Sequence, residues 1–337
     1  MRIGYFGDGP WSHEALAKIL QSGDFEIAFI TARHGSADPV LRRYAEQLGV
    51  GFWVHPNVNA PDFLEQVVSA RADLLVSMSF DQILGPGILA AAPLGFINCH
   101  AGALPFYRGR NILNWVLING ESRFGVTVHR VDTGIDTGDI ILQRFAEIGP
   151  EDDYGSVLTQ AVSLCAETLF DALVLLKKGQ APRVSQATIH PVGTYCSRRG
   201  AGDEWLDWNW PSVRVHNFVR ALASPGPGAR THGPKGELAI WRTELIAGAP
   251  VYLDKPGAIV GRGRGHVVVK TGDSSIRVSL VGRVAEAGIP AAPESPKFSI
   301  GTQLASELAV RVRDLERRLR MLEETHSAAR AGGTTAR

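Results

Sequence analysis

Three polar side chains with complementary chemistry lie in the stretch from Asn98 to Asp139. Asn98 and His100 follow an apolar run typical of the end of a buried strand, and because one residue separates them they should project from the same face. A carboxamide can donate hydrogen bonds to an oxyanion, and an imidazole can take or relay a proton. Asp136 lies in a glycine-flanked turn, from which its carboxylate could orient the imidazole. The combination suits attack of an amine on a carbonyl carbon.

A structural histidine with satisfied hydrogen bonds is the simplest alternative for any lone histidine after a strand. We interpret His129, on the next predicted strand, in that way. For His100, the neighbouring Asn98 and Asp136 favour a catalytic role instead. Cys99 should face the opposite side of the strand, because side chains alternate, and we interpret it as a packing residue.

Strands and helices alternate through the first half of the chain. Strands are predicted at 1–6, 25–30, 52–54, 73–77, 124–131 and 140–145, and helices at 12–21, 38–48, 61–71, 111–118 and 154–179. This alternation predicts an α/β fold with a doubly wound, mostly parallel sheet, whose ligands bind at the carboxyl ends of the strands. After the first strand, a glycine loop leads to Ser12, the expected N-cap of a helix whose N-terminus could bind an anion.

The motifs of the central stretch resemble the folate-dependent formyltransferases. The resemblance rests on Asn98-Cys99-His100, Leu104–Gly109 (LPFYRG), Gly125–His129 (GVTVH) and Asp136–Asp139 (DTGD), and it extends from residue 1 to about residue 285. This family includes the methionyl-tRNA, glycinamide ribonucleotide and nucleotide-sugar N-formyltransferases. The segments 110–115 (RNILNW) and 120–121 (GE), with the opening residues 4–14, are most similar to the nucleotide-sugar branch.

The resemblance implies a Rossmann-like formyltransferase domain, a smaller C-terminal β-barrel of the oligonucleotide-binding type (OB-like), and N10-formyltetrahydrofolate as co-substrate. It implies catalytic roles for Asn98, His100 and Asp136. The expected folate pocket comprises Met78, Phe80, Ile83, Leu84 and Asp132. The expected substrate contacts are Gly9, Trp11, Ser12, Arg33, Tyr107, Arg108 and Asn111, of which Arg108 should brace the active-site loops through a carboxylate. No metal is expected, because the formyl group is already activated on the folate.

Some of these assignments have plain alternatives. The four apolar residues of the expected folate pocket could simply pack in the core, and Arg33 could be a solvated surface residue. The glycine loop before Ser12 could be an ordinary connection between a strand and a helix. His129, Asp132 and Asp139 are further titratable groups near Asp136, but the family pattern places the catalytic carboxylate at Asp136.

Length and composition indicate an ordinary globular enzyme of two domains. The chain has 337 residues, of which 45% are hydrophobic and 20% charged. No segment approaches the roughly 20 uninterrupted apolar residues of a membrane helix, so we expect no membrane partner. The first residues lack the layout of a secretory signal, and the three cysteines are an odd number without metal spacing. We therefore expect a cytoplasmic protein with reduced thiols.

Charge is distributed unevenly along the chain. Residues 1–204 carry 16 Lys and Arg against 22 Asp and Glu, whereas residues 205–300 are net basic. An acidic catalytic half is a poor surface for RNA, although the basic half leaves that option open. The resemblance adds that the tRNA-directed branch carries a longer basic loop at the place of residues 31–48. Its absence here predicts no nucleic-acid partner.

We predict five segments. They are a catalytic domain at 1–186, a linker at 187–204, an OB-like domain at 205–300, a charged helix at 301–325 and a disordered tail at 326–337. Short strands are expected at 238–241, 251–253, 258–260, 267–270 and 276–281, and the tryptophans at 205, 208 and 210 are expected at the domain interface. Leucines and valines spaced four and three apart from Leu308 to Leu322 are typical of a coiled coil, which predicts a homodimer or a helix lying on the protein.

The expected function is transfer of a formyl group from N10-formyltetrahydrofolate to the amine of a nucleotide-linked amino deoxysugar. The best match is a dTDP-4-amino-4,6-dideoxyhexose, made for a surface polysaccharide such as lipopolysaccharide O-antigen. Three alternatives remain: methionyl-tRNA formylation, hydrolysis of formyltetrahydrofolate, and a non-catalytic binding module.

Overall fold

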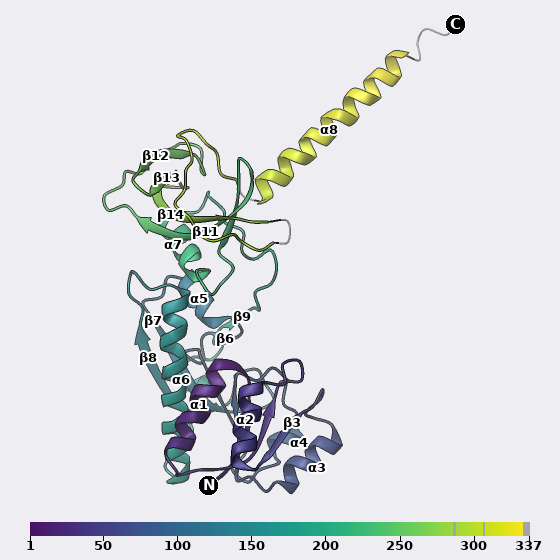
Figure 1. Ribbon diagram of the computed structural model, residues 1–337, viewed down its shortest axis with the longest axis vertical. Coiled ribbons are helices and arrows are strands. Elements are labelled where there is room, and N and C mark those ends of the chain that lie inside the picture. The colour runs from purple at the N-terminus through teal and green to yellow at the C-terminus, as the bar shows by residue number, and fades with distance from the viewer. Residues whose placement is uncertain (286–287, 306, 333–337) are drawn as a thin grey trace. The chain divides into compact units, whose positions relative to one another are not determined.

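The computed structural model describes residues 1–285, 288–305 and 307–332, and it contains two compact units (Figure 1). The first unit comprises Met1–Val116 and Glu121–Arg199, and the second comprises Leu117–Gly120 and Gly200–Arg337. Each unit buries a hydrophobic core of its own.

A seven-stranded sheet forms the centre of the first unit. Its strands are β1 (Arg2–Gly7), β2 (Glu26–Ala32), β3 (Gly51–Val54), β4 (Leu74–Met78), β5 (Phe96–His100), β7 (Arg123–Arg130) and β8 (Ile140–Glu147), in the order β3-β2-β1-β4-β5-β7-β8. The strands from β3 to β5 pair in parallel, and β7 and β8 are antiparallel to their neighbours. The predicted α/β fold with a mostly parallel, doubly wound sheet is confirmed.

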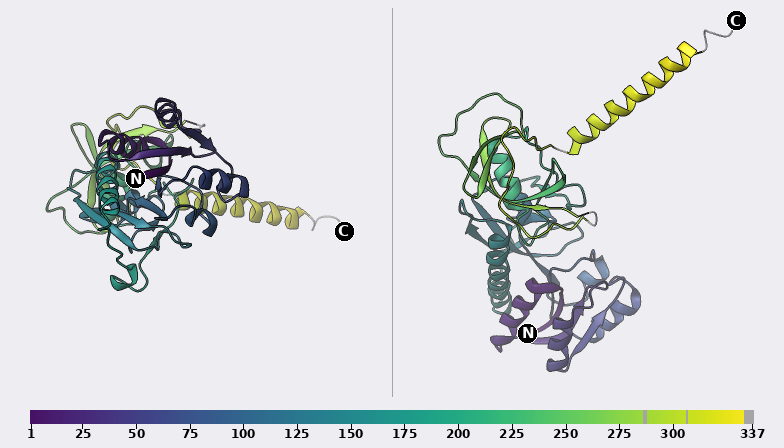
Figure 2. Two further views of the ribbon diagram at one scale, coloured as in Figure 1. Left: turned by 90° about the horizontal axis from the view of Figure 1, so that it is seen from below. Right: turned by 45° about the horizontal axis from the view of Figure 1, so that its top comes forward.

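Helices cover both faces of this sheet. They are α1 (Gly9–Gln21), α2 (Pro39–Leu48), α3 (Pro61–Ser69), α4 (Pro86–Leu89), α5 (Ile112–Ile118) and α6 (Tyr154–Lys177). Neighbouring side chains of a strand point to opposite faces. On β1, Tyr5 donates a hydrogen bond to the carbonyl of Ser12 in α1, whereas Phe6 belongs to a core cluster with Phe63 of α3 and Ile88 of α4. Two views show α1 and α6 side by side (Figures 1 and 2).

Helix α6 is apolar because it is a core helix of this unit. By length and composition alone it could cross a membrane. Its buried positions include Val157, Ala161, Cys165, Leu169 and Leu173, which recur every four residues along the face that packs on the sheet. Asp153 caps its N-terminus by accepting hydrogen bonds from the N–H groups of residues 155 and 156.

The order of the strands fixes where ligands can bind. From β1 the chain proceeds outward to β2 and β3, and it then returns to β4 and β5 on the other side of β1. Ligands of open α/β sheets bind at the carboxyl ends of the strands where this reversal occurs. Here those ends are Gly7, Met78 and His100.

Helix α1 begins earlier than predicted, and Ser12 is not its N-cap. Asp8 holds the N-cap position, and Pro10 lies in the first turn, where its fixed φ and missing N–H suit a helix. Ser12 is fully buried inside the helix, and its hydroxyl donates to the Tyr5 hydroxyl over 3.2 Å. A buried, hydrogen-bonded serine cannot contact a substrate, so that expectation is corrected.

The prediction of a linker at 187–204 is also corrected, because residues up to Arg199 belong to the first compact unit. A 3₁₀ turn, η1 (Gln186–Thr188), opens this segment. Further along, β9 (Tyr195–Cys196) pairs in parallel with β6 (Arg108–Gly109). Backbone hydrogen bonds therefore tie the segment to the loop that follows β5, and this long-range pairing leaves no signal in local sequence.

A five-stranded antiparallel sheet forms the second unit. Its strands are β10 (Ala229–Gly233), β11 (Gly236–Leu245), β12 (Ile259–Gly263), β13 (His266–Lys270) and β14 (Ser275–Arg283), in the order β10-β11-β14-β13-β12, and α7 (Ser212–Ala221) packs on it. Strand β10 was not predicted, and 251–253 is not a strand. Val251 and Leu253 are 82% and 97% exposed, so they lack the partner strand that an apolar run requires.

The three tryptophans pack inside the second unit. Trp208 is 2% exposed and donates its indole N–H to the Thr231 hydroxyl over 2.9 Å. Trp205 stacks on His232, and Trp210 meets an aromatic neighbour of α7 edge-on. We expected these tryptophans at the domain interface, but these contacts all lie within the second unit.

Helix α8 (Glu307–Gly332) is the last element (yellow in Figure 1). It starts later than predicted, because Ala305 forms an antiparallel bridge with His232 of β10. It also continues to Gly332, into the segment that we expected to be disordered from residue 326. Residues 333–337 of that expected tail lie outside the described part of the chain.

Candidate active site

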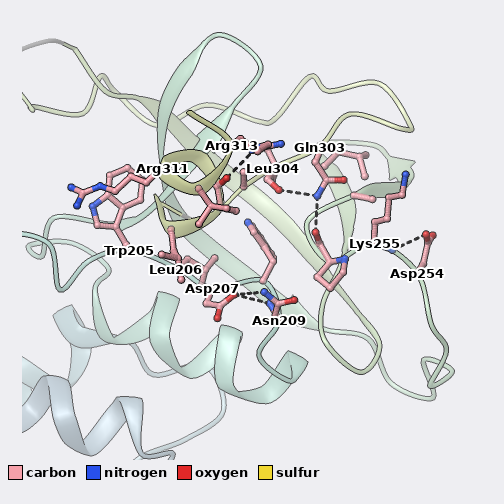
Figure 3. A pocket seen from close by; sticks show the side chains of 18 of the residues that line it. Trp205, Leu206, Asp207, Asn209, Asp254, Lys255, Gln303, Leu304, Arg311 and Arg313 are labelled. Carbon is pink, nitrogen blue, oxygen red and sulfur yellow. Dashed lines mark hydrogen bonds between the residues drawn. The ribbon is translucent and has the colours of Figure 1, made fainter. Parts of the chain in front are cut away.

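A cleft of about 750 Å³ lies in the first unit at the carboxyl ends of β4 and β5. Asn98, His100 and Asp136 all line it, so three residues from two separate segments converge on this cleft. A larger hollow of about 1510 Å³ lies in the second unit (Figure 3), where residues such as Trp205, Lys255 and Arg311 line it. None of the expected catalytic or binding residues borders that hollow, so we assign the site to the cleft.

The strand β5 aims Asn98 and His100 into the cleft. Cys99 between them is buried, and its thiol approaches the carbonyl of Cys165 in α6 at 3.6 Å, although both cysteines are also among the residues that border the cleft. Burial raises the pKa of the Cys165 thiol, so that thiol stays protonated and inert.

A backbone carbonyl orients the imidazole of His100. Its Nε2–H donates to the Tyr107 carbonyl over 2.7 Å, which turns Nδ1 toward Asp136. The distance from Nδ1 to Asp136 Oδ2 is 3.6 Å, which is too long for a hydrogen bond. We expected Asp136 to orient the ring, but the Tyr107 carbonyl holds it, and the Asp136 carboxylate only faces its Nδ1. The Tyr107 side chain instead donates its hydroxyl to Glu121, over 2.5 Å.

The carboxylate of Asp136 is held in its ionised form. Burial alone would raise its pKa, but the facing His100 and His129 and the N–H of Gly109, which donates to Oδ2 over 2.9 Å, outweigh burial. Its pKa therefore lies well below the usual value for an aspartate. Asp136 also has a positive φ of 55°, a conformation that aspartate tolerates better than most residues. Strained backbone of this kind is common at functional sites.

His129 is a member of this site that sequence reasoning missed. It lies directly opposite Asn98 in the β5–β7 register. Its Nδ1–H donates to the Arg130 carbonyl over 2.8 Å, and Nε2 faces both Asn98 Nδ2 at 3.3 Å and Asp136 Oδ1 at 3.6 Å. It was interpreted as structural because the antiparallel pairing of β5 with β7, rather than spacing along the chain, places it beside Asn98.

Arg108 braces the loops of the site, although not through a carboxylate as expected. Its guanidinium donates twice to the Gln186 amide oxygen, over 3.1 and 2.7 Å, and it also donates to the Val192 carbonyl. Gln186 in turn donates to the carbonyls of Asp136 and Gly138, both over 2.8 Å. Arg108 is buried and does not border the cleft, so it positions the Asp136 loop and does not contact a ligand there.

All five residues expected to contact the folate line the cleft. They are Met78, Phe80, Ile83, Leu84 and Asp132. Ile83 is 73% exposed, so its apolar side chain is open to a ligand, whereas Met78 is buried. Asp132 uses Oδ1 to accept hydrogen bonds from Gly134 N–H and the Thr137 hydroxyl, which shapes the turn before Asp136.

The residues expected to bind substrate divide into two groups. Trp11, Arg33 and Asn111 line the cleft, whereas Gly9, Ser12, Tyr107 and Arg108 do not. Arg33 is anchored by donating to the Ser79 carbonyl over 2.9 and 2.6 Å. Asn111 accepts a hydrogen bond from the Arg199 N–H with its side-chain oxygen.

The start of α1 already holds an internal anion. The Gly9 N–H and His13 Nε2 both bond Asp38 Oδ2, each over 2.7 Å. Asp38 also caps α2, through Val40 and Leu41 N–H. A carboxylate from the chain thus occupies the position at which we expected an anion to bind. Two exposed residues that we did not predict, Arg110 and Arg198, line the cleft and offer positive charge instead.

This geometry can stabilise an oxyanion and accept a proton in one place. Asn98 has two side-chain N–H groups, and only one is directed at His129. The second can serve an oxyanion that forms in the cleft. The ionised Asp136 next to two imidazoles supplies a base.

The family described as formyl transferase matches residues 12–173, and its C-terminal domain matches residues 200–290. The methionyl-tRNA formyltransferase of Pelotomaculum thermopropionicum is 30% identical over 286 residues, which cover 83% of this chain and 90% of that protein.

Solved structures share the fold. An N-formyltransferase from Helicobacter canadensis, solved with folinic acid and dTDP-3-aminofucose, matches with a TM-score of 0.60 and 18% identity, over 82% of this chain and 98% of that one. WlaRD, a sugar 3N-formyl transferase solved with dTDP and 5-N-formyl-tetrahydrofolate, matches with a TM-score of 0.61 and 18% identity, over 82% and 97%. Both family matches and the 30% identity to a formyltransferase, over most of this chain and most of that protein, show that the chain belongs to the formyl transferase family and is a formyltransferase.

Proposed function

We propose that this enzyme transfers the formyl group of N10-formyltetrahydrofolate to the primary amine of a nucleotide-linked amino deoxysugar. A dTDP-4-amino-4,6-dideoxyhexose is the first acceptor to test. The observation that carries the proposal is the convergence of Asn98, His100 and Asp136 on one cleft, in a member of the formyl transferase family. We infer a cytoplasmic enzyme that serves the synthesis of a surface polysaccharide such as O-antigen.

The folate would occupy the part of the cleft formed after β4. Phe80, Ile83 and Leu84 offer apolar surface to a pterin ring, and the backbone of this segment offers hydrogen bonds. Ser79 in the same segment has a positive φ of 59°, and Arg33 holds its carbonyl. A segment fixed in this way is pre-organised for a rigid ligand. Both solved relatives described above contain a folate, which supports the choice of donor.

The reaction is an acyl transfer with a tetrahedral intermediate. The amine nitrogen attacks the formyl carbon, a C–N bond forms, and the carbonyl oxygen becomes an oxyanion. The free N–H of Asn98 and a protonated His100 would stabilise that oxyanion. The carboxylate of Asp136 would take a proton from the amine, directly or through water, and the bond from the carbon to N10 of the folate would break as N10 gains a proton.

The rim of the cleft suits an anionic acceptor. Arg33, Arg110 and Arg198 all line it, and guanidinium groups recognise phosphates through paired hydrogen bonds. Trp11 and Tyr195 add aromatic surface on which a base or a sugar could stack. Both features fit a nucleoside diphosphate sugar, and the two solved relatives bind dTDP or a dTDP-linked amino sugar.

Methionyl-tRNA formylation is the second candidate, because the relative with 30% identity is named for it. One feature counts against it. The connection between β2 and α2 has only six residues. Its first basic residue, Arg33, donates a hydrogen bond to the Ser79 carbonyl and lies 3.7 Å from the Asp8 carboxylate. Such a short, anchored connection offers little surface to an RNA stem.

An acceptor panel separates these functions. Purified enzyme is given N10-formyltetrahydrofolate and either dTDP-, UDP- or GDP-linked amino sugars or charged methionyl-tRNA, and folate release and product mass are measured. We expect a formylated dTDP-amino sugar and no formyl-methionyl-tRNA. Formylation of the tRNA alone would overturn the sugar proposal, and folate turnover without any acceptor would indicate a hydrolase.

A further inference from the structure

The terminal helix α8 carries an apolar stripe that is largely exposed, and its first two members, Leu308 and Val312, also border the hollow of the second unit. Leu308, Val312, Leu315, Leu319 and Leu322 recur at alternating intervals of four and three residues. Between 42% and 72% of each of these residues is exposed. Large apolar side chains exposed in a continuous row usually mark an interaction surface. The helix begins beyond residue 290, where the match to the family's C-terminal domain ends.

We propose that α8 forms a parallel, two-stranded coiled coil with α8 of a second copy of this chain. The spacing assigns Val312 and Leu319 to heptad position a, and Leu308, Leu315 and Leu322 to position d. Leucine at d, together with β-branched Val312 at one a position, favours two strands over three or four.

The charges beside the stripe select both the partner and its direction. Arg311 and Arg318 fall at position g, and Glu316 and Glu323 fall at position e. In a parallel pair, each g residue faces the e residue five positions later on the partner. Arg311 therefore meets Glu316 of the other copy, and Arg318 meets Glu323. An antiparallel pair would instead place arginine against arginine and glutamate against glutamate.

The intrahelical ion pairs do not prevent this pairing. Arg318 contacts Asp314 of the same helix at 2.8 Å, and Arg317 bonds the same carboxylate. Both arginines are more than 70% exposed, so the contacts are solvent-screened and easily exchanged. Arg317 lies at the outer position f and can keep Asp314 when Arg318 turns to the partner.

The first test measures the mass of the full-length enzyme by sedimentation equilibrium from about 1 to about 100 µM, because dimerisation depends on concentration. We expect a concentration-dependent species of twice the 36.3 kDa chain mass. Leu315→Glu should raise the dimer dissociation constant at least tenfold. The matched control is Met321→Glu, because Met321 is similarly exposed, at 61%, but lies off the stripe at position c.

Charge variants test the pairing itself. Arg311→Glu with Arg318→Glu should dissociate the dimer, and so should Glu316→Arg with Glu323→Arg, because each double variant faces like charges. Mixing the two double variants should restore a dimer to within about threefold of the wild-type affinity, because opposite charges meet again. An unrestored mixture would contradict the e–g pairing.

Direction is tested by a single cysteine. Leu322→Cys should form a disulfide between two copies under mild oxidation, because d positions of a parallel pair lie within disulfide distance. An antiparallel pair would keep residues 322 far apart. A monomer at all concentrations, a dimer unaffected by Leu315→Glu, or a dimer without the Leu322→Cys cross-link would each overturn the proposal. Formyl transfer by every variant reports that it is folded.

Discussion

Two histidines share one carboxylate at the centre of the cleft. Each has one ring nitrogen committed to a backbone carbonyl, His100 to Tyr107 and His129 to Arg130. The remaining nitrogen of each ring lies 3.6 Å from Asp136. The carboxylate is therefore fixed in charge but not tied by a short hydrogen bond to either ring. The carboxylate can therefore accept a proton from a ligand without first breaking a short hydrogen bond to either histidine.

The orientation of His100 depends on the missing side chain of Gly102. A methyl group at residue 102 would lie 2.5 Å from both His100 Nε2 and the Tyr107 carbonyl oxygen. Gly102→Ala should therefore break their hydrogen bond and turn the ring, which lowers kcat about 10- to 100-fold and, because a backbone carbonyl must also shift, lowers the melting temperature. Steady-state kinetics and a circular dichroism melt measure the two effects.

A matched glycine gives the control for this variant. An added methyl group at Gly35 would meet no atom within 4 Å. Gly35→Ala should leave kcat within about twofold of wild type, because surface changes of this kind are nearly neutral. Equal activity of the Gly102→Ala and Gly35→Ala variants would show that the Tyr107 carbonyl does not hold the catalytic ring.

The low pKa of Asp136 predicts how stability depends on pH. Its pKa is lower in the folded state than the unperturbed value of about 3.9, so the ionised form favours folding. This contribution is complete above about pH 4 and is lost as the pH falls through the folded-state pKa. Asp136→Asn lacks it at every pH. Wild type should therefore lose roughly 1–3 kcal/mol more than the variant between pH 5 and pH 2.5, as measured by urea unfolding. Parallel pH curves for the two proteins would contradict this assignment.

At the scale of elements, a single amide joins the loops that build the site. Gln186 of η1 is 3% exposed and accepts two hydrogen bonds from Arg108 of β6. It donates two to the loop that carries Asp136. Four hydrogen bonds from one buried side chain leave little freedom to either loop.

Gln186→Leu tests this bridge. It would leave the Arg108 guanidinium and the carbonyls of Asp136 and Gly138 without these partners, at a cost of roughly 1–3 kcal/mol for each buried group that stays unpaired. We expect faster hydrogen exchange at residues 132–139 and a lower kcat. Gln180→Leu, at an exposed position outside this bridge, should change neither, and unchanged exchange in the Gln186→Leu variant would show that the loop holds itself in place.

Elements that depend on local pattern could be predicted from sequence, whereas elements that depend on long-range pairing could not. The parallel strands and the α6 helix follow from apolar runs and helical periodicity. The pairing of β9 with β6 and the bridge at Ala305 join segments about 70 to 90 residues apart. Those two contacts explain why the expected linker belongs to the first unit and why α8 starts late.

The same division applies to the site. Asn98, His100 and Asp136 could be predicted because their types and motifs are distinctive along the chain. His129 could not, since only the sheet register brings it to the cleft, and Gln186 could not, since only long-range hydrogen bonds join its buried amide to the Asp136 loop. Ser12 was misassigned, because a serine before a helical pattern is typical of an N-cap, but Pro10 starts the helix earlier.

At the scale of the whole molecule, the chemistry and the proposed assembly reside in different units. Every residue that lines the cleft falls between Trp11 and Arg198, in the first unit. The coiled-coil stripe is confined to α8 in the second unit. Loss of dimerisation should therefore not abolish formyl transfer.

A chain that ends after Ala305 tests this separation. It keeps the bridge between Ala305 and His232 but lacks α8. We expect kcat/KM within about threefold of wild type, together with a monomeric mass at all concentrations. A loss of more than tenfold in activity at unchanged thermal stability would show that α8 contributes to the site.

The most direct test of the account compares wild type with Asn98→Ala in a formyl-transfer assay with N10-formyltetrahydrofolate and a dTDP-amino sugar. Asn98 offers an N–H to the oxyanion only as the transition state forms, so its loss should lower kcat by about 10²–10³-fold and leave KM for the sugar within about threefold. Equal kcat values for two folded proteins would contradict the catalytic assignment of this cleft.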